Sequence, residues 1–193
     1  AYTREKTLAA TEDELVEVGR RHLRMLAMHG VTTLEAKSGY ALTVDGEMTM
    51  LRAIARLRDE FAGTIVSTYL GGHLIPPEFS TRRADYIAEV IAALPAIKAQ
   101  GLAEFCDVFI DPIALTNEEG MAISRAAKEA GLYVRMHADE FSDNGTAALG
   151  VMASAMSVDH LAGINEETAQ KLGESNTVAV LLPGTMFYTN TDL

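Results

Sequence analysis

The sequence predicts one α/β domain over residues 1–193, in which six parallel strands alternate with helices as part of a (β/α)8 TIM barrel. Three observations carry this prediction. Helical and strand-like segments alternate without a linker, nearly every strand-like segment is continuously apolar, and unusual polar residues follow the strands. Continuously apolar strands are typical of a parallel sheet covered by helices. With 193 residues, 48% of them hydrophobic, the chain can build one substantial core but not two.

The helices are predicted from apolar residues at three-to-four spacing. The first spans residues 12–29 and ends at Gly30, a residue that commonly follows a helix. The residues that this spacing places on one face are Leu15, Val18, His22, Met25 and Leu26. Later helices are predicted at residues 46–61, 82–99, 117–130, 144–154 and 165–173. Two of them start at Asn117 and Asn165 with acidic first turns, as helix N-termini often do.

The strands are predicted between these helices. They cover residues 31–37, 64–70, 105–110, 132–137, 156–160 and 177–182. Polar residues follow almost all of them, namely Glu35, Lys37, Tyr40, His73, Asp111, His137, Glu140, Asp159, His160 and Thr185. The alternation alone fits either an open doubly wound sheet or a closed barrel.

The distribution of these polar residues favours the barrel. A barrel gathers all strand ends around one mouth, whereas an open sheet concentrates its functional groups at one switch point. No GxGxxG or phosphate-binding loop follows a strand, which weakens the nucleotide-binding alternative. Six strands are fewer than the eight that close such a barrel, and we therefore expect a partial barrel.

The charge balance excludes several classes of partner. Lys and Arg total 16 against 27 Asp and Glu, a formal net charge of −11, and such a surface repels nucleic acid and anionic membranes. No apolar stretch is long enough to suggest a membrane span. We therefore expect a small-molecule partner and a cytoplasmic location. Cys106 is the only cysteine, which excludes a disulfide within the chain and a cysteine-based zinc cluster.

Two histidines at strand ends suggest a metal site. His137 and His160 each end a predicted strand, and neutral imidazoles at such rigid positions bind zinc or iron. A lone buried histidine is more often a packed core residue. Because His73 and Glu140 accompany this pair, the functional interpretation is favoured.

Two carboxylates follow His137 closely. Glu140 has left the strand and could act as a base over the barrel mouth. Asp139 shares a strand face with His137, and could either orient that residue or start the next helix. His22 and His29 belong to the first helix, where packing or solvent exposure explains them.

Six motifs occur in order along nearly the whole chain. They are EAKSGY at 35–40, YLGGHLIPPEF at 69–79, AEFCDVF at 103–109, MHADEFSDNG at 136–145, SVDHL at 157–161 and VAVLLPGTMFY at 178–188. Together they resemble the imidazolonepropionase family of the amidohydrolase superfamily. KSGY and GHLIPPEF decide the family, because the superfamily as a whole shares only the barrel and the metal histidines.

The resemblance implies an amidohydrolase-type barrel with one divalent metal ion, zinc or iron. The implied reaction is hydrolysis of the cyclic amide of 4-imidazolone-5-propanoate to N-formimidoyl-L-glutamate, a step of histidine degradation. His137 would be a metal ligand, and Tyr40 and His73 would bind substrate. Glu140 would contact the substrate ring and the attacking water, and His160 would polarise that water or transfer its proton. The resemblance also implies a homodimer.

Two parts of the family's metal site have no counterpart in the sequence. The family's first strand ends in an HxH pair, which occurs nowhere here, and Asp192 does not correspond to the aspartate that ends its eighth strand. We therefore expect the chain to be a central piece of a longer enzyme, with strands two to seven. His137 would be the only metal ligand of the family in this piece, and the piece alone would be nearly inactive.

Three alternatives remain open at this point. Lys37 at a strand end could form a Schiff base, which would make the chain an aldolase-like lyase without metal. The chain could instead be another metal-dependent amidohydrolase or deaminase. It could also be an inactive barrel fragment whose open strand edges are covered by association.

Overall fold

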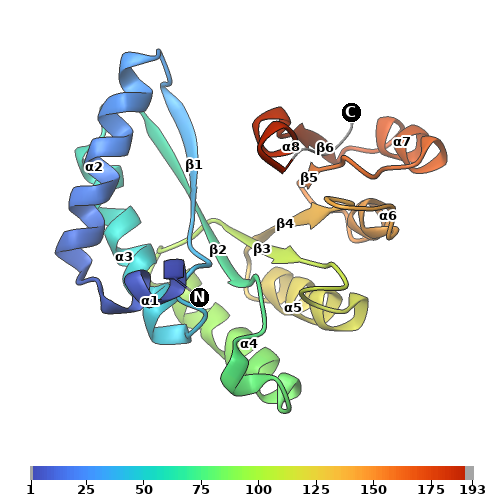
Figure 1. Cartoon of the computed structure of the whole chain (residues 1–193), viewed down its shortest axis with the longest axis horizontal. Coiled ribbons are helices and arrows are strands. Elements are labelled where there is room, and N and C mark those ends of the chain that lie inside the picture. The colour runs from blue at the N-terminus through green and yellow to red at the C-terminus, as the bar shows by residue number, and fades with distance from the viewer. Residues whose placement is uncertain (1, 190–193) are drawn as a thin grey trace.

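The computed structural model describes residues 2–189, except for the side chain of Thr189. Asp192, considered above, lies outside the described residues. Six parallel strands form one sheet in the order β1-β2-β3-β4-β5-β6. Figure 1 shows that this sheet curves into part of a barrel, with the connecting helices along its outer side. The partial (β/α)8 barrel predicted from the sequence is therefore confirmed.

The six predicted helix–strand couplets are all present, with ends that differ by a few residues. The strands are β1 (Thr33–Lys37), β2 (Thr64–Gly72), β3 (Phe105–Phe109), β4 (Tyr133–Ala138), β5 (Ser157–His160) and β6 (Val178–Leu181). The helices are α2 (Glu12–Met28), α3 (Val44–Glu60), α4 (Arg83–Ala99), α5 (Asn117–Glu129), α6 (Thr146–Met152) and α7 (Glu166–Gly173).

Three short helices are additional to the prediction. They are α1 (Tyr2–Ala9), the 3-10 helix η1 (Pro77–Phe79) and α8 (Pro183–Thr189). Helix α1 buries no residue. Its sequence, YTREKTLA, has no apolar stripe of the kind on which helix prediction depends. Within residues 2–189, no helix combines the length and apolar character needed to cross a bilayer.

The strands have two unlike faces, which differs from the continuous apolar character expected. On β4, Val134 and Met136 belong to the hydrophobic core between sheet and helices, whereas Arg135 and His137 lie on the opposite face. Likewise on β3, Cys106 and Val108 join that core, and Asp107 contacts side chains from other strands instead. The inner face of the partial barrel is therefore polar. Successive side chains of a strand point to opposite faces of the sheet, and one face can therefore carry charged residues while the other is apolar.

The buried stripe of α2 is not the predicted one. Its buried residues are Val16 and Leu23, while Val18 is 39% exposed and Met25 48% exposed. Helix α2 packs closely on α3 at Gly19, where a glycine leaves room for Leu57. A Cβ added at Gly19 would lie only 2.2 Å from Cδ1 of Leu57. This close approach rotates the predicted face toward the edge of the sheet.

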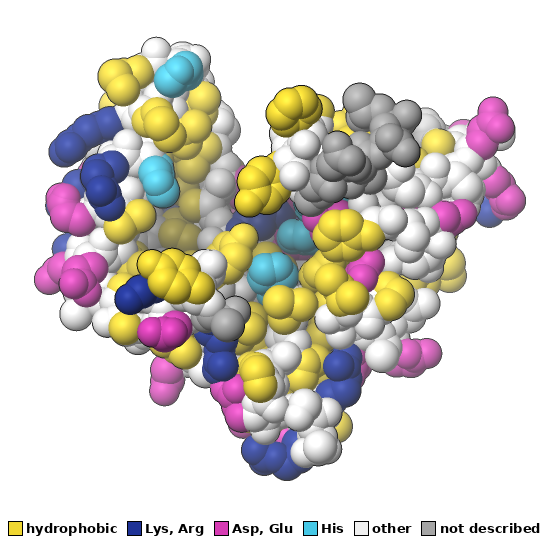
Figure 2. Space-filling model, in the orientation of Figure 1, with side chains coloured by type: hydrophobic (Ala, Val, Ile, Leu, Met, Phe, Trp, Pro, Cys, Tyr) yellow, Lys and Arg dark blue, Asp and Glu magenta, His cyan; other side chains and the backbone are white. Residues whose placement is uncertain are grey.

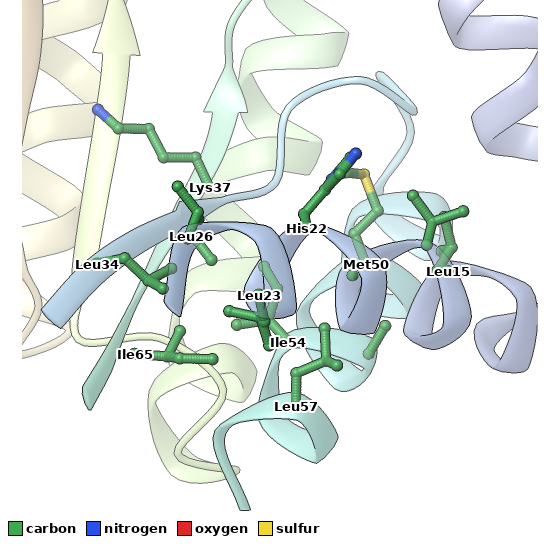
Figure 3. Close-up of a pocket in the computed structure, with 14 residues that line it drawn as sticks. Leu15, His22, Leu23, Leu26, Leu34, Lys37, Met50, Ile54, Leu57 and Ile65 are labelled. Carbon is green, nitrogen blue, oxygen red and sulfur yellow. The ribbon is translucent and has the colours of Figure 1, made fainter. Parts of the chain in front are cut away.

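The rotated face of α2 forms one wall of an open apolar cleft of about 270 Å³ (Figure 3). Its lining includes Leu15, His22, Leu26, Leu34 and Met50. His22 is exposed at this cleft and His29 is exposed at the end of α2, as expected of both. The cleft runs beside β1, which ends the described sheet.

Side-chain caps begin α5 and α7 at different positions relative to their asparagines. The N-cap of α5 is Thr116, whose hydroxyl accepts from the N–H of Glu119 in a capping box, and Asn117 is already inside the helix. The N-cap of α7 is Asn165, whose Oδ1 accepts from the N–H of Thr168 at 2.8 Å. The cap of α5 was therefore predicted one residue too late, at Asn117 instead of Thr116, because threonine caps a helix about as well as asparagine.

Replacing Asn165 by Ala should lower the free energy of unfolding by about 1 kcal/mol, because the Thr168 N–H loses its side-chain acceptor. Asn117→Ala is the matched control, since Asn117 caps nothing, and it should change stability by less than about 0.5 kcal/mol. Urea unfolding followed by circular dichroism measures both. Equal losses in the two variants would show that the cap contributes nothing specific.

Candidate functional site

A cavity of about 400 Å³ opens at the carboxyl ends of the strands. It is lined by Glu35, Lys37, Tyr40, His73, His137, Glu140, Asp159, His160, Val180, Leu182 and Thr185. The structure thus brings together the five residues proposed from the sequence as site residues, which come from four different strand ends. Figure 2 shows histidine side chains in the hollow at the centre of the molecule. Asp111 does not join them and instead accepts from Ile113 and Asn144 in the neighbouring loops.

Four rings run in a row along the cavity. Tyr40 meets His73 edge-on with ring centroids 5.4 Å apart, and His73 lies 6.1 Å from His137. His137 in turn lies 5.1 Å from His160. Phe109 contacts both His73 and His137 from the inner face of β3. The row defines one wall along which a planar ligand could lie.

His160 reaches the cavity through an unusual backbone conformation. In a regular strand Asp159 and His160 would point to opposite faces of the sheet. His160 instead has φ of 79°, in the left-handed region that non-glycine residues rarely adopt, and both side chains line the same cavity. Such conformations cost free energy and cluster at functional sites. The turn at the end of β5 therefore aims the imidazole inward.

A second left-handed residue, Asp139 with φ of 46°, separates the roles of the two carboxylates after β4. Asp139 is buried, and its carboxylate accepts from the backbone N–H of Asn144, Thr146 and Ala147 at the start of α6. Of the two roles considered for Asp139, the structure supports the helix-starting one. The next residue, Glu140, lines the cavity, with Oε1 lying 3.4 Å from Nδ1 of His160.

The loop after β1 is held by Glu47, which the sequence did not single out. The buried Glu47 carboxylate accepts from the backbone N–H of Gly39, Ala41 and Leu42. The O atom of Gly39 lies 2.7 Å from Nδ1 of His73. Because a carbonyl only accepts, Nδ1 of His73 carries the proton and Nε2 is left as an acceptor. Glu47 thus fixes Tyr40 and His73 through one loop.

On the wall of the cavity, Lys37 forms an ion cluster with acidic residues of other strands. Its Nζ lies 2.5 Å from Oδ2 of Asp107 and 2.8 Å from Oδ2 of Asp159. Burial lowers the pKa of the Lys37 amine, but the charges of Asp107, Asp159 and Glu35 outweigh burial and leave this pKa raised. A Schiff base requires the neutral amine. The geometry therefore speaks against the lyase alternative.

His137 is hydrogen-bonded to the same cluster. Its Nδ1 lies 3.1 Å from Oδ2 and 3.2 Å from Oδ1 of Asp107, which is fully buried. Burial disfavours the charged form of His137, but the Asp107 carboxylate outweighs this effect and raises the pKa of His137. Sequence reasoning missed Asp107 and weighed Lys37 only as a nucleophile. A signal was present, because Asp107 is the single polar residue in the apolar run FCDVF.

The pKa values of His73, His160 and Glu140 are each shifted in the direction of the neutral form. Burial lowers the pKa of His73, and burial together with the nearby His137 lowers the pKa of His160 to about 4. Burial also raises the pKa of Glu140. The 3.4 Å contact between Glu140 and His160 is too long to act as a strong ion pair, and burial therefore dominates both groups.

The described residues offer a metal one oriented ligand. In residues 2–189, no three His, Cys, Asp or Glu side chains converge closely enough to hold an ion. His137 nevertheless meets the requirement for a single ligand, because its Nδ1 is bound to a carboxylate and its other nitrogen is free for the cavity. The chain therefore fits part of a metal site and not the whole of one.

No protein-family model matches the chain. It is 44% identical over 183 residues to the imidazolonepropionase of Symbiobacterium thermophilum, and 41% identical over 182 residues to that of Bacillus velezensis. Each alignment covers 94% of this chain and 43% of the relative. The chain is a homologue of the imidazolonepropionases. It spans less than half the length of the relatives that it matches.

Solved structures with the same fold are far less similar in sequence. A zinc-bound amidohydrolase from Burkholderia ambifaria aligns with a TM-score of 0.71 and 17% identity, over 94% of this chain and 51% of that chain. An adenine deaminase from Arthrobacter aurescens aligns with a TM-score of 0.72 and 15% identity, over 100% of this chain and 59% of that one. At these sequence identities, the similarity to the two solved structures shows a shared fold only.

The lowered pKa of His160 predicts a specific sensitivity to acid. Between pH 6.5 and about 4 the unfolded chain binds a proton at His160 while the folded chain does not, and stability therefore falls as pH drops through this window. In the His160→Gln variant, the free energy of unfolding should fall by about 1–3 kcal/mol less than in the original chain over this pH window. The measurement is chemical unfolding at a series of pH values.

The matched control for this prediction is His29→Gln, which alters an exposed histidine at the end of α2. The control should retain the pH dependence of the original chain. If His160→Gln retained it as well, His160 would not be held in its neutral form by the fold.

Proposed function

We propose that the chain provides most of the catalytic cavity of a metal-dependent hydrolase that opens the cyclic amide of 4-imidazolone-5-propanoate to give N-formimidoyl-L-glutamate. The observation that carries the proposal is the convergence of Tyr40, His73, His137, Glu140 and His160 on one cavity. The homology to imidazolonepropionases along 94% of the chain supports the same reaction.

His137 is proposed as a ligand of one divalent metal ion, zinc or iron, through Nε2. Its Nδ1 is engaged by Asp107, which leaves the other nitrogen available. Zinc is bound in one amidohydrolase of the same fold, which supports this class of metal. The metal, when bound, supplies a water whose pKa is lowered toward neutrality. The remaining ligands are proposed to come from protein outside residues 2–189.

Glu140 and His160 are proposed to move the protons of the reaction. A carboxyl whose pKa burial raises is better matched to proton transfer near neutral pH than an exposed one. Glu140 would take the proton of the attacking water and deliver it to the departing ring nitrogen. His160, neutral at pH 7 because its pKa is about 4, would accept a hydrogen bond from that water or from Glu140.

Tyr40 and His73 are proposed to bind the substrate. The unprotonated Nε2 of His73 could accept a hydrogen bond from an N–H of the imidazolone ring, because its Nδ1 proton faces the Gly39 carbonyl. Tyr40 is half exposed at the rim, where its hydroxyl could reach the propanoate arm. Helix α1 borders the same rim, with Arg4 donating to the Ala41 carbonyl at 3.1 Å.

The organisation of the protein follows as part of this proposal. Residues 1–193 would form one partial barrel domain acting on a small molecule, within a homodimeric cytoplasmic enzyme. Both β1 and β6 are end strands of the described sheet, and such open edges favour pairing with further strands. An isolated chain without that cover would bind metal weakly and be nearly inactive.

A chimera tests the proposal directly. Residues 1–193 replace the homologous segment of the Symbiobacterium thermophilum relative, and hydrolysis of imidazolonepropionate is measured for the chimera and for the 193-residue chain alone. The chimera should hydrolyse imidazolonepropionate, and the activity of the isolated chain should remain near the background rate. In the chimera, Glu140→Gln should lower kcat by about 10²–10⁴-fold with little change in KM, because a base acts mainly in the transition state.

Glu118→Gln is the matched control, because Glu118 is exposed at the start of α5 and does not line the proposed catalytic cavity. It should leave both kinetic constants unchanged. A folded chimera without activity would contradict the proposed reaction. An active Glu140→Gln chimera would contradict the role given to Glu140.

A further inference from the structure

The Lys37 side chain crosses the inner face of the sheet to reach two strands that flank β4. In Figure 3 it extends from β1 away from the apolar cleft that lies beside α2. Its Nζ lies 2.5 Å from Oδ2 of Asp107 on β3 and 2.8 Å from Oδ2 of Asp159 on β5. Strand β4, which carries His137, pairs with both of these strands. One ammonium group therefore bridges the two neighbours of the strand that carries His137.

The Asp107 carboxylate determines which nitrogen of His137 carries the proton. A carboxylate only accepts hydrogen bonds, and both of its oxygens lie within 3.2 Å of Nδ1 of His137. Nδ1 therefore donates, and the lone pair of the neutral ring resides on Nε2. His137 also lines the cavity. When the ring is neutral, a fixed tautomer always presents the same acceptor, Nε2, to the cavity.

Lys37 makes this arrangement possible beside two buried carboxylates. Asp107 is fully buried and Asp159 is 4% exposed, and two such carboxylates close to one another repel strongly without a cation. Asp159 is otherwise partnered by the Ser157 hydroxyl, which donates to Oδ1 at 2.9 Å. The ammonium binds both carboxylates and so offsets their mutual repulsion, and it holds Asp107 beside His137.

We propose that Lys37 and Asp107 are positioning residues that hold His137 in its Nδ1-protonated tautomer, with Lys37 acting through Asp107. The value of this tautomer for binding a metal rests on the proposed function, whereas the tautomer itself does not. A merely structural ion cluster would stabilise the sheet without selecting one tautomer. The state of the His137 ring therefore separates the two interpretations.

Nitrogen NMR of the 193-residue chain, labelled with ¹⁵N-histidine and kept free of metal, reads out the tautomer. Single histidine substitutions assign the five rings, and spectra recorded at pH 9 favour the neutral forms. His137 should be protonated at Nδ1. In Asp107→Asn the amide oxygen should turn to Lys37, which only donates, and the amide NH₂ should then face Nδ1 and move the ring proton to Nε2. Asp59→Asn, an exposed change, should leave the spectrum unaltered.

The Lys37 contribution is tested by Lys37→Met, with Lys171→Met on the exposed face of α7 as its control. Lys37→Met should populate both tautomers of His137, because Asp107 loses the group that orients it. In the chimera described above, Asp107→Asn should also weaken zinc binding by about 10- to 100-fold, measured by competition with a chelator.

A wild-type His137 protonated at Nε2, or an unchanged tautomer in Asp107→Asn, would overturn this inference. If either variant fails to fold, the wild-type spectrum alone still decides. The result is also separable from the proposed function. An inactive chimera with the expected tautomer would contradict only the reaction, whereas an active chimera with the opposite tautomer would contradict only the positioning role.

Discussion

The cavity depends on one partly buried ammonium group that is shared by two buried carboxylates. Lys37, contributed by β1, binds Asp107 on β3 and Asp159 on β5, and Asp107 then binds His137 on β4. Removing a single partner from such a cluster leaves an uncompensated buried charge, which is costly. The cluster therefore joins four strands across the inner face of the sheet and gives the end of β4 a defined hydrogen-bonding state. The apolar core on the other face of the sheet could not impose this state, because packing alone does not distinguish the two nitrogens of an imidazole.

Around this cluster the site is shaped by departures from regular structure. The left-handed residues Asp139 and His160 redirect the chain at the ends of β4 and β5. One brings Glu140 over the cavity after Asp139 has started α6, and the other turns the His160 ring inward. On the opposite side, the buried Glu47 carboxylate holds the loop that carries Tyr40. Strained or closely held backbone of this kind persists only where surrounding contacts fix it. The rigid strands thus determine where the strand ends lie, and the local backbone geometry at those ends determines which side chains meet.

Much of the fold could be predicted from the sequence, because each helix–strand couplet has its own local periodicity. The convergence of His137, His160 and Glu140 also followed, since the ends of parallel strands in a barrel share one mouth. Pairing between distant residues did not follow. Lys37 lies 70 residues from Asp107 and 122 from Asp159, and no local pattern records such a contact. The buried stripe of α2 was misjudged for the same reason, because the approach of Gly19 to Leu57 is a tertiary event.

The ion cluster on the inner face of the sheet presents one particular nitrogen of His137, Nε2, to the cavity. Anomalous diffraction at the zinc edge, from crystals of the chimera grown with zinc, tests it most directly because it locates the metal relative to each ring atom. We expect an anomalous peak at bonding distance from Nε2 of His137, with Nδ1 still hydrogen-bonded to Asp107. A zinc ion bonded to Nδ1, or a peak only at the exposed His22 or His29, would contradict it.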